Sequence, residues 1–430
     1  MSRRVLLTGA RVVDPAAGRD EVADVLVEDG AVAAEGSAAR AAVLDCDGLV
    51  LAPGLVDLHA HLREPGREDR ETVETGSRAA ALGGFTAVSA MANTDPVADT
   101  AAVVHEVRDL AARAGLCDVF PVGAITRGLR GEEMAAIGEM VEAGVRIFSD
   151  DGHTVPDARV LRNALTYARA FDGVVIAEHC EEASLVEGGQ MHEGYHSYSL
   201  GLAGRPREAE EIVVARDLAL ARLTGGRLHV CHLSSAGSVD LVRRAKAEGL
   251  RVTAEVTPHH LAFTDEDLLT YDTNLKVNPP LRAPDDREAL RAGLADGAID
   301  AVATDHAPHA VEEKEAEFDQ APPGTIGLET ALAAVVTHLV EPGRLSFLRA
   351  IEALSTVPAR ILGVPDHGGP IAPGRPANLV VFDPAAEWVV EPPFASRSRN
   401  SAFLGRTLRG RVIHTLYRGE LVVADGKAQR

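Results

Sequence analysis

The sequence predicts an α/β protein: a (β/α)₈ TIM-type barrel with a small composite β-sandwich formed by the N- and C-terminal segments. Two observations lead to this prediction. Between residues 50 and 365, eight short apolar runs alternate with longer amphipathic segments, a pattern typical of parallel strands joined by right-handed crossovers. Outside these residues, both ends of the chain carry short strand-like runs separated by Gly and Asp turns. A doubly wound open sheet is the alternative for the central segment.

The predicted barrel strands can be assigned one by one. They lie in the runs LVLAPGLVDLHAH, TAVSAMANT, CDVFPVGAIT, GVRIFSDDG, GVVIAEHC, RLHVCHLSS, RVTAEVTPHH and AIDAVATDHAPH. Helices are expected between them, at residues 72–82, 101–114, 132–143, 157–170, 207–223, 236–248 and 285–296. Eight strands are the number that closes a barrel of this type.

The two flanks are each too short to form a comfortable domain alone. We therefore expect residues 1–53 plus 366–430 to form one composite β-sandwich, with the barrel of residues 54–365 inserted between them. Residues 187–206 are predicted to form a long polar loop after the fifth strand, acting as a lid or a partner surface. The acidic segment within residues 310–322 is a second candidate for a lid.

Composition limits the classes of function. The chain has 430 residues and a net charge of −21, which argues against nucleic acid or an anionic membrane as the main partner. We see no signal peptide at the N-terminus, and no apolar run approaches the roughly 20 residues that cross a membrane. The four cysteines have no CxxC spacing, which favours reduced thiols in a cytoplasmic protein.

The stretch GLVDLHAHLREPG at residues 54–66 is the most informative motif. On a strand, alternate side chains share one face, so His59, His61 and Arg63 are expected to point the same way. Two imidazoles at this spacing can bind one metal ion. An arginine beside them can bind an anion, so the motif predicts a metal site with an anion-binding group.

Further polar residues follow the other strands. In barrel enzymes, the active site lies at the carboxyl ends of the strands. Four histidines and two aspartates are predicted to converge there: His59, His61, Asp151, His179, His232 and Asp305. Imidazole with carboxylate favours zinc or another borderline divalent ion.

Neighbouring residues are predicted to support the site without binding metal. Strand alternation predicts that Cys180, Cys231 and His229 face away from the site, so thiolate ligation is not expected. Packing or support of ligands is the favoured role for His259 and His260. Asp150 and the loop residue His153 are likewise not expected to bind metal, and Asp150 is assigned a capping or supporting role.

This set resembles the amidohydrolase superfamily, in which an HxH pair, two further histidines and an aspartate occupy strands 1, 5, 6 and 8. Many members bridge two metals with a carboxylated lysine on strand 4. Here no lysine precedes Lys246, and Asp151 stands at the end of strand 4. This departure makes the chain similar to the type I dihydroorotases.

Further segments carry the same resemblance: HLREPG at 61–66, MANTDP at 91–96, TPHHL at 257–261, KVNPPLR at 276–282, TDHAPH at 304–309 and GLET at 327–330. The segment APPG at 321–324 departs from it, because relatives often have an aromatic residue before the glycine. The resemblance implies reversible hydrolysis of L-dihydroorotate to N-carbamoyl-L-aspartate in pyrimidine synthesis. It implies metal-activated hydroxide as the nucleophile, with Asp305 as the proton shuttle.

The resemblance also assigns the remaining roles. His59, His61 and Asp305 would bind one Zn²⁺ and His179 and His232 a second, with Asp151 between them; whether one or two ions bind stays open. The substrate would be bound by His61, Arg63, Asn93, Asn278, His309, Pro323 and Gly324. The resemblance also implies a homodimer and, as in some relatives, association with aspartate transcarbamoylase.

Two alternatives to this function stay open. One is another cyclic-amide hydrolase, such as a hydantoinase or allantoinase. These families usually keep the strand 4 lysine and take neutral substrates, which would leave Arg63 without a purpose. The other is a non-catalytic structural homologue, because a fold alone does not prove activity.

Overall fold

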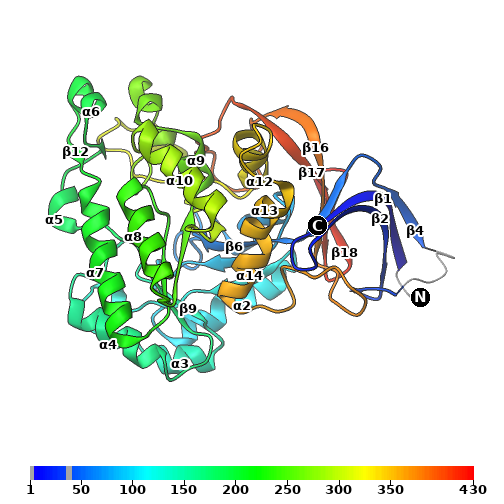
Figure 1. The fold of residues 1–430 in the computed structure, drawn as a ribbon, viewed down its shortest axis with the longest axis horizontal. Helices are drawn as coiled ribbons and strands as arrows, with labels where there is room; N and C mark the ends of the chain where they lie inside the picture. The colour runs from blue at the N-terminus through cyan, green and yellow to red at the C-terminus, as the bar shows by residue number, and fades with distance from the viewer. Residues whose placement is uncertain (1–3, 35–40) are drawn as a thin grey trace.

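The computed structural model describes residues 4–34 and 41–430. Residues 1–3 and 35–40 of the predicted N-terminal segment lie outside the described residues. Two parts are visible in Figure 1. One is a sheet built from the blue and the orange-red ends of the chain, and the other is a larger strand-and-helix part built from the middle of the chain. Within the described ranges, every helix is too short or too polar to cross a membrane.

Eight parallel strands form the larger part, one in each predicted apolar run. They are β6 (Leu55–Ala60), β7 (Phe85–Ala90), β8 (Asp118–Pro121), β9 (Ile147–Phe148), β10 (Val175–Glu178), β13 (Leu228–Val230), β14 (Val252–Val256) and β15 (Ala301–Val302). They pair as β6-β7-β8 and as β9-β10-β13-β14-β15. Isolated parallel bridges, Gly123↔Phe148 and Ala60↔His306, connect the two groups at both edges. This order defines a TIM-barrel-type α/β fold.

Helices follow the strands at the predicted places. They are α1 (Val73–Leu82), α2 (Ala101–Ala114), α3 (Ile137–Glu142), α4 (Ala158–Ala168), α7 (Glu208–Thr224), α8 (Ala236–Ala247) and α10 (Pro284–Asp296). The third helix is shorter than predicted, because Met134 pairs with Thr126 in an antiparallel bridge. After β15 come α12 (Ala331–Val335), η4 (Val336–Val340), α13 (Phe347–Ile351), η5 (Glu352–Thr356) and α14 (Val357–Leu362).

The apolar faces of these helices form the main core against the strands. α4 shows why the sequence folds this way: Val160, Leu161, Ala164 and Leu165 recur at helical spacing and are buried. The side chain of Asp157 caps its N-terminus by accepting a bond from the Arg159 N–H at 2.7 Å. Capping and one-sided burial together specify where the helix begins and which face it packs.

Both ends of the chain join one nine-stranded sheet. Its strands are β1 (Arg4–Asp14), β2 (Arg19–Glu28), β3 (Ala31–Val32), β4 (Ala42–Asp45), β5 (Val50–Pro53), β16 (Leu379–Val389), β17 (Thr407–Tyr417), β18 (Glu420–Ala424) and β19 (Lys427–Ala428). The order is β19-β18-β17-β16-β5-β1-β2-β3, with β4 on β1. β5 therefore joins the two ends: it lies parallel to β1 and antiparallel to β16.

Residues 187–206 are more structured than predicted. In place of a loop, they contain β11 (Met191–His192), α6 (Tyr195–Leu200) and β12 (Gly204–Arg205), which follow α5 (Ala183–Val186). The prediction missed them because the elements are short and polar. Met191 pairs with Gly204 and is buried in an apolar cluster with Phe263 and Phe318, which fixes the segment on the barrel.

The remaining elements are short. They are η1 (Arg127–Leu129), α9 (Pro258–Ala262), η2 (Asp265–Thr270), η3 (Thr273–Leu275) and α11 (Val311–Lys314). The acidic segment after Asp305 contains α11, and its Lys314 and Phe318 side chains are buried. The segment therefore packs on the barrel in this structure, and a lid movement stays a prediction.

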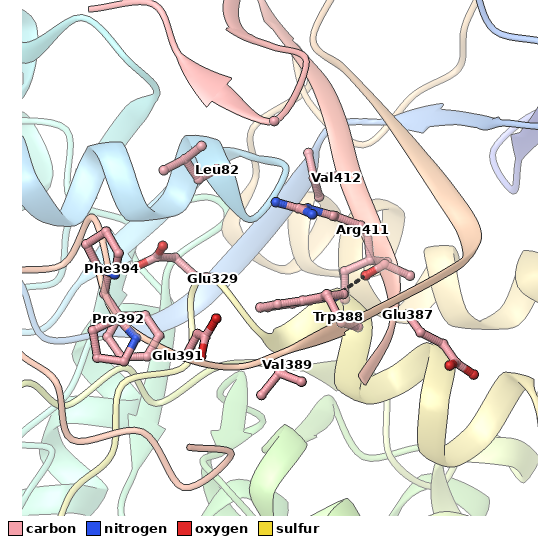
Figure 2. A pocket seen from close by; sticks show the side chains of 15 residues that line it. Leu82, Glu329, Glu387, Trp388, Val389, Glu391, Pro392, Phe394, Arg411 and Val412 are labelled. Atoms are coloured by element: carbon pink, nitrogen blue, oxygen red, sulfur yellow. Dashed lines mark hydrogen bonds between the residues drawn. The ribbon is translucent and has the colours of Figure 1, made fainter. Parts of the chain in front are cut away.

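A cavity of about 570 Å³ lies where α1 and α12 meet the β16–β17 hairpin. Figure 2 shows Trp388, Phe394 and Glu329 around it. One oxygen of Glu329 accepts bonds from the N–H groups of Ala395 and Ser396, at 3.0 and 3.2 Å. None of the predicted site residues, all of which are described, lines this cavity.

Candidate active site

The predicted ligands meet in a buried cluster at the carboxyl ends of the barrel strands. Each of the six is at most 7% exposed: His59, His61, Asp151, His179, His232 and Asp305. Two groups have donor atoms close enough to share an ion, namely His59, His61 and Asp151, and then Asp151, His179 and His232. The structure thus brings together residues that lie up to 246 positions apart in the chain.

Asp151 lies between the two histidine pairs. Its Oδ2 is 3.2 Å from His59 Nε2 and 3.4 Å from His61 Nε2. Its Oδ1 is 3.1 Å from His232 Nε2 and 3.6 Å from His179 Nδ1. Burial alone raises the pKa of Asp151, but the charge of His59 and the bonds to the other histidines keep that pKa well below its usual value. Each oxygen of this carboxylate faces one pair.

A second carboxylate, that of Glu255, orients the His59 ring by contacting its Nδ1. Glu255 Oε1 is 2.8 Å from His59 Nδ1, and its Oε2 is 3.0 Å from His229 Nε2. In the neutral imidazole that binds a metal, Nδ1 donates to this carboxylate, which leaves the lone pair of His59 on Nε2, on the side of the cluster. Glu181 contacts His179 in a similar way, with its Oε2 3.2 Å from Nε2. Sequence reasoning missed both glutamates. A glutamate inside the buried strand β14 was a usable signal for Glu255, whereas Glu181 follows the end of β10.

Strand alternation predicted His229 and Cys231 on the wrong face. His229 and Cys231 both face the interior, and the Cys231 sulfur lies within 4.8 Å of donor atoms of His59 and Glu255. The cause is His232, whose φ of 29° interrupts the alternation and lets adjacent residues point inward. Burial raises the pKa of the Cys231 thiol well above its usual value, so this thiol is neutral.

Other neighbours agree with their predicted roles. Cys180 faces away from the cluster, and its sulfur lies 3.6 Å from a carboxylate oxygen of Asp217 on α7. Asp150 accepts the backbone N–H groups of Ile125 and Thr126, at 2.8 and 2.9 Å, and so fixes the loop after β8. Both ring nitrogens of His260 have partners, Thr257 Oγ1 and the Pro279 carbonyl.

Asp305 lies against the HxH pair. Its Oδ1 is 3.1 Å from His61 Nε2 and 3.6 Å from His59 Nε2. Burial opposes its charge, but the charge of His59 and the bond to His61 outweigh burial and lower the pKa of Asp305. The residue has a φ of 44°, a left-handed conformation that turns its carboxylate toward the histidines.

Arg63 is the cation of the site. β6 ends at Ala60, and Arg63 has a φ of 63°, so it reaches the mouth through an irregular turn and not by strand alternation. Its Nε donates to the Pro308 carbonyl at 3.2 Å, and the residue is 9% exposed. Burial, with the charge of Arg70, lowers the pKa of Arg63 to about 10. Among the described residues, no carboxylate oxygen lies within 4.0 Å of its guanidinium nitrogens.

The other predicted substrate residues surround this centre. Asn93 Oδ1 is 2.9 Å from His61 Nδ1, and Asn278 is hydrogen-bonded to Arg205. His309 Nε2 donates to the Pro323 carbonyl at 2.9 Å. Gly324 has a φ of 141°, and a side chain there would begin 2.8 Å from His309 Nε2, so only glycine fits.

The fold and the convergent histidines and carboxylates define a cyclic amidohydrolase. Residues 48–238 match the dihydro-orotase-like family and residues 217–423 match the amidohydrolase family. The chain is 51% identical to a dihydroorotase of Pelotomaculum thermopropionicum, covering 98% of this chain and 99% of the relative. It is 53% identical to a dihydroorotase of Streptomyces coelicolor, covering 99% of each. The chain therefore belongs to the dihydroorotase family.

Solved structures share the fold. An L-hydantoinase from Arthrobacter aurescens superposes with a TM-score of 0.89 at 28% identity, covering 100% of this chain and 98% of that one. A D-hydantoinase from Thermus sp. gives 0.80 at 26% identity, covering 99% and 96%. The barrel architecture is thus common to this chain and to hydantoinases, and specificity has to be decided by the side chains at the mouth.

Proposed function

We infer that this chain is a dihydroorotase, which catalyses the reversible hydrolysis of L-dihydroorotate to N-carbamoyl-L-aspartate in de novo pyrimidine (UMP) synthesis. The observation that carries this inference is the buried guanidinium of Arg63 beside Asp305, without a carboxylate partner among the described residues. A buried unpaired charge is costly, and the carboxylate of dihydroorotate supplies the missing partner in a bidentate geometry that arginine favours.

We propose that the cluster binds Zn²⁺, as one or two ions per subunit. The donor set fits such an ion, because imidazole nitrogen and carboxylate oxygen are ligands that zinc prefers. His59 Nε2 also fits, since it is buried, forms no well-aligned hydrogen bond with any described residue and lies 3.2 Å from Asp151 Oδ2. His59, His61 and Asp305 would hold one ion, His179 and His232 the other, with Asp151 shared. A divalent ion bound there acidifies water and polarises an amide carbonyl.

Asp305 would move the proton in this reaction. In hydrolysis, the water oxygen bonds to the ring carbonyl carbon, the bond from that carbon to the ring nitrogen breaks, and the nitrogen gains a proton. The Asp305 carboxylate takes the proton from the attacking water and delivers it to the leaving nitrogen. Its lowered pKa means that it is ionised and ready to accept a proton at neutral pH. Ring closure runs through the same group in reverse.

The remaining residues would hold the substrate. Arg63 binds the carboxylate, and His309, Asn93 and Asn278 offer polar groups around it. The backbone of Pro323 and Gly324 would cover the ring, and His61 would contact the substrate from the ligand side. Burial lowers the pKa of His309, so His309 is neutral, and its Nε2–H donates to the Pro323 carbonyl.

Hydantoin hydrolysis is the second candidate, favoured by the close superposition on the L-hydantoinase. Hydantoin carries no carboxylate, however, and would leave the buried Arg63 unpaired. Retention of all six converging side chains also speaks against a non-catalytic homologue.

One assay separates these candidates. The purified protein is given dihydroorotate, hydantoin and allantoin in turn, and its metal content is measured by elemental analysis. We expect turnover of dihydroorotate with a kcat/KM at least 100-fold above that for the neutral rings, and zinc in the protein, since about 3 kcal/mol separates a paired from an unpaired buried charge. Preferred turnover of hydantoin or allantoin would overturn the proposed substrate.

We also propose the domain division and the assembly. Residues 1–53 with 366–430 would form the composite β-sandwich, supported by an apolar core of their own that joins Leu7, Val27 and Leu379. Residues 54–365 would form the (β/α)₈ barrel. All four cysteines are free and buried, which supports a reducing, cytoplasmic location. A homodimer, and association with aspartate transcarbamoylase, are proposals that sedimentation of the protein with and without that enzyme would test.

A further inference from the structure

The segment between β16 and β17 reaches from the nine-stranded sheet to the barrel mouth. It is anchored along the way: Glu329 accepts the Ala395 and Ser396 N–H groups at the cavity of Figure 2. Ser398 Oγ donates to the Arg70 carbonyl at 2.7 Å. The segment then arrives at Asn400, which is only 3% exposed.

The Asn400 side chain bonds to two of the loops that carry proposed substrate residues, the loop after β15 and the Pro323–Gly324 turn. Its Nδ2 donates to the carbonyls of Ala307 and Gly324, at 3.0 and 3.1 Å. Its Oδ1 accepts the His309 N–H at 3.2 Å. All three bonds go to backbone groups, so one amide fixes the main chain of the loop after β15 and that of the Pro323–Gly324 turn.

The Asn400 backbone adds to this link. Its carbonyl accepts the Ile326 N–H at 2.9 Å and the Thr325 hydroxyl at 3.0 Å. Lys314 also donates to the Gly324 carbonyl, at 3.0 Å, but its ammonium bonds only to the Pro322–Gly324 side. Of these two side chains, Asn400 alone donates to both loops.

We propose that Asn400 is a positioning residue for substrate binding, by which the C-terminal segment shapes the carboxylate pocket of the barrel. Among the described residues, the hydrogen bonds of Asn400 reach neither the six converging side chains nor Arg63. It acts through His309 and Gly324, whose spacing it sets. The inference rests on the proposed function, because the role of His309 and Gly324 in binding dihydroorotate is part of that proposal.

The test compares Asn400→Ala with Asn378→Ala. Asn378 is a matched control: it is also a buried asparagine of the C-terminal segment, and its side chain also bonds to backbone, at Asp366 O and Arg418 N. We expect Asn400→Ala to raise the KM for dihydroorotate about tenfold, a loss comparable to one or two buried hydrogen bonds. The kcat should change less than threefold and the metal content should not change. Asn378→Ala should leave KM within twofold.

Hydrogen exchange gives a readout that is independent of activity. Backbone amides of peptides covering residues 305–310 and 322–328 should exchange faster in Asn400→Ala and not in Asn378→Ala. If Asn400→Ala does not fold, Asn400→Asp replaces it. This variant keeps the shape and the bond from the His309 N–H, but turns an oxygen toward the two carbonyls, and KM should again rise about tenfold or more.

The outcomes separate the two proposals. A wild-type protein without dihydroorotate turnover overturns the proposed function. A wild-type protein with turnover whose KM is unchanged by the Asn400 substitutions overturns the positioning role alone. Equal KM increases in the Asn400 and Asn378 variants would also overturn it, because they would show a general loss of stability.

Discussion

The barrel mouth and the nine-stranded sheet both contain non-glycine residues with left-handed backbone, but for different reasons. In the sheet, these residues are exposed, and each precedes a glycine in a two-residue hairpin turn: Asp29, Arg418 and Asp425. Such turns need a positive φ, because the turn must match the twist of the strands. At the mouth, the left-handed residues are buried, follow the ends of barrel strands and belong to no hairpin: Arg63, His232 and Asp305.

This contrast shows where the chain accepts strain. An Asp before Gly in a hairpin satisfies a local rule. A buried residue held in left-handed backbone costs about 1–3 kcal/mol, which the surrounding structure must supply. At the mouth, the three residues are an arginine, a histidine and an aspartate of the candidate active site. We infer that the conformation is kept there because the side chains are needed, and each prediction below tests one side of the comparison.

The largest effect is expected for Asp305→Asn. The amide keeps the size of the side chain but cannot accept a proton, so kcat should fall by about 10³-fold or more. Asparagine tolerates left-handed backbone, so the thermal midpoint should stay within a few degrees. Steady-state kinetics, with metal analysis of the same preparation, measures the change.

The control for Asp305→Asn is the metal content of the variant. A metal content near the wild-type value shows that the site is intact. Turnover within tenfold of wild type would contradict the proton-shuttle role. Loss of both metal and turnover would show that Asp305 acts mainly as a ligand.

The next largest effect is expected for Arg63, which we compare with Arg418 because both arginines have left-handed backbone. Arg63→Met keeps the apolar stem and removes the charge, and the KM for dihydroorotate should rise about 100-fold, since truncating one partner of a buried charge pair costs about 2–5 kcal/mol. Arg418→Met removes an exposed ion pair with Asp118, and KM should not change. An Arg63→Met protein that binds dihydroorotate normally, measured by KM and by product inhibition, would refute carboxylate binding by Arg63.

A smaller effect is expected for Glu255→Gln. The amide removes the negative charge that orients His59 through Nδ1, and metal affinity should fall about 10- to 100-fold. Competition with a chelator, followed by metal release, measures this affinity without substrate. Glu387→Gln, which breaks an exposed pair with Arg409, should release metal like the wild type. Equal metal affinities in the two variants would show that the charge of Glu255 does not contribute to metal binding.

Most of the fold could be predicted from the sequence. Strand and helix alternation placed all eight parallel strands, and the identity of residues after each strand predicted which side chains meet. These features depend on local periodicity and on a general property of barrels. The join of both chain ends in one sheet was also predictable, because neither flank could bury its own apolar strands.

Three features were not predicted, and each depends on contacts distant in the chain or on broken periodicity. Cys231 was placed on the wrong face because alternation assumes regular strand dihedrals, and His232 departs from them. Glu255 was overlooked inside an otherwise ordinary strand pattern. Asn400 lies 91 residues after His309, in a segment whose path over the barrel is set by packing alone.

The smallest effect is expected for Asp425→Asn, the same substitution as at Asp305 but in the sheet. Asp425 and Gly426 form the turn between β18 and β19, and Asn-Gly suits this turn as well as Asp-Gly. The free energy of unfolding should change by less than about 0.5 kcal/mol, which is typical of surface substitutions, and kcat should equal the wild-type value. Urea denaturation and the dihydroorotate assay measure both. If this substitution lowered kcat, left-handed backbone in the sheet would matter for the site, and the distinction between the two regions would fail.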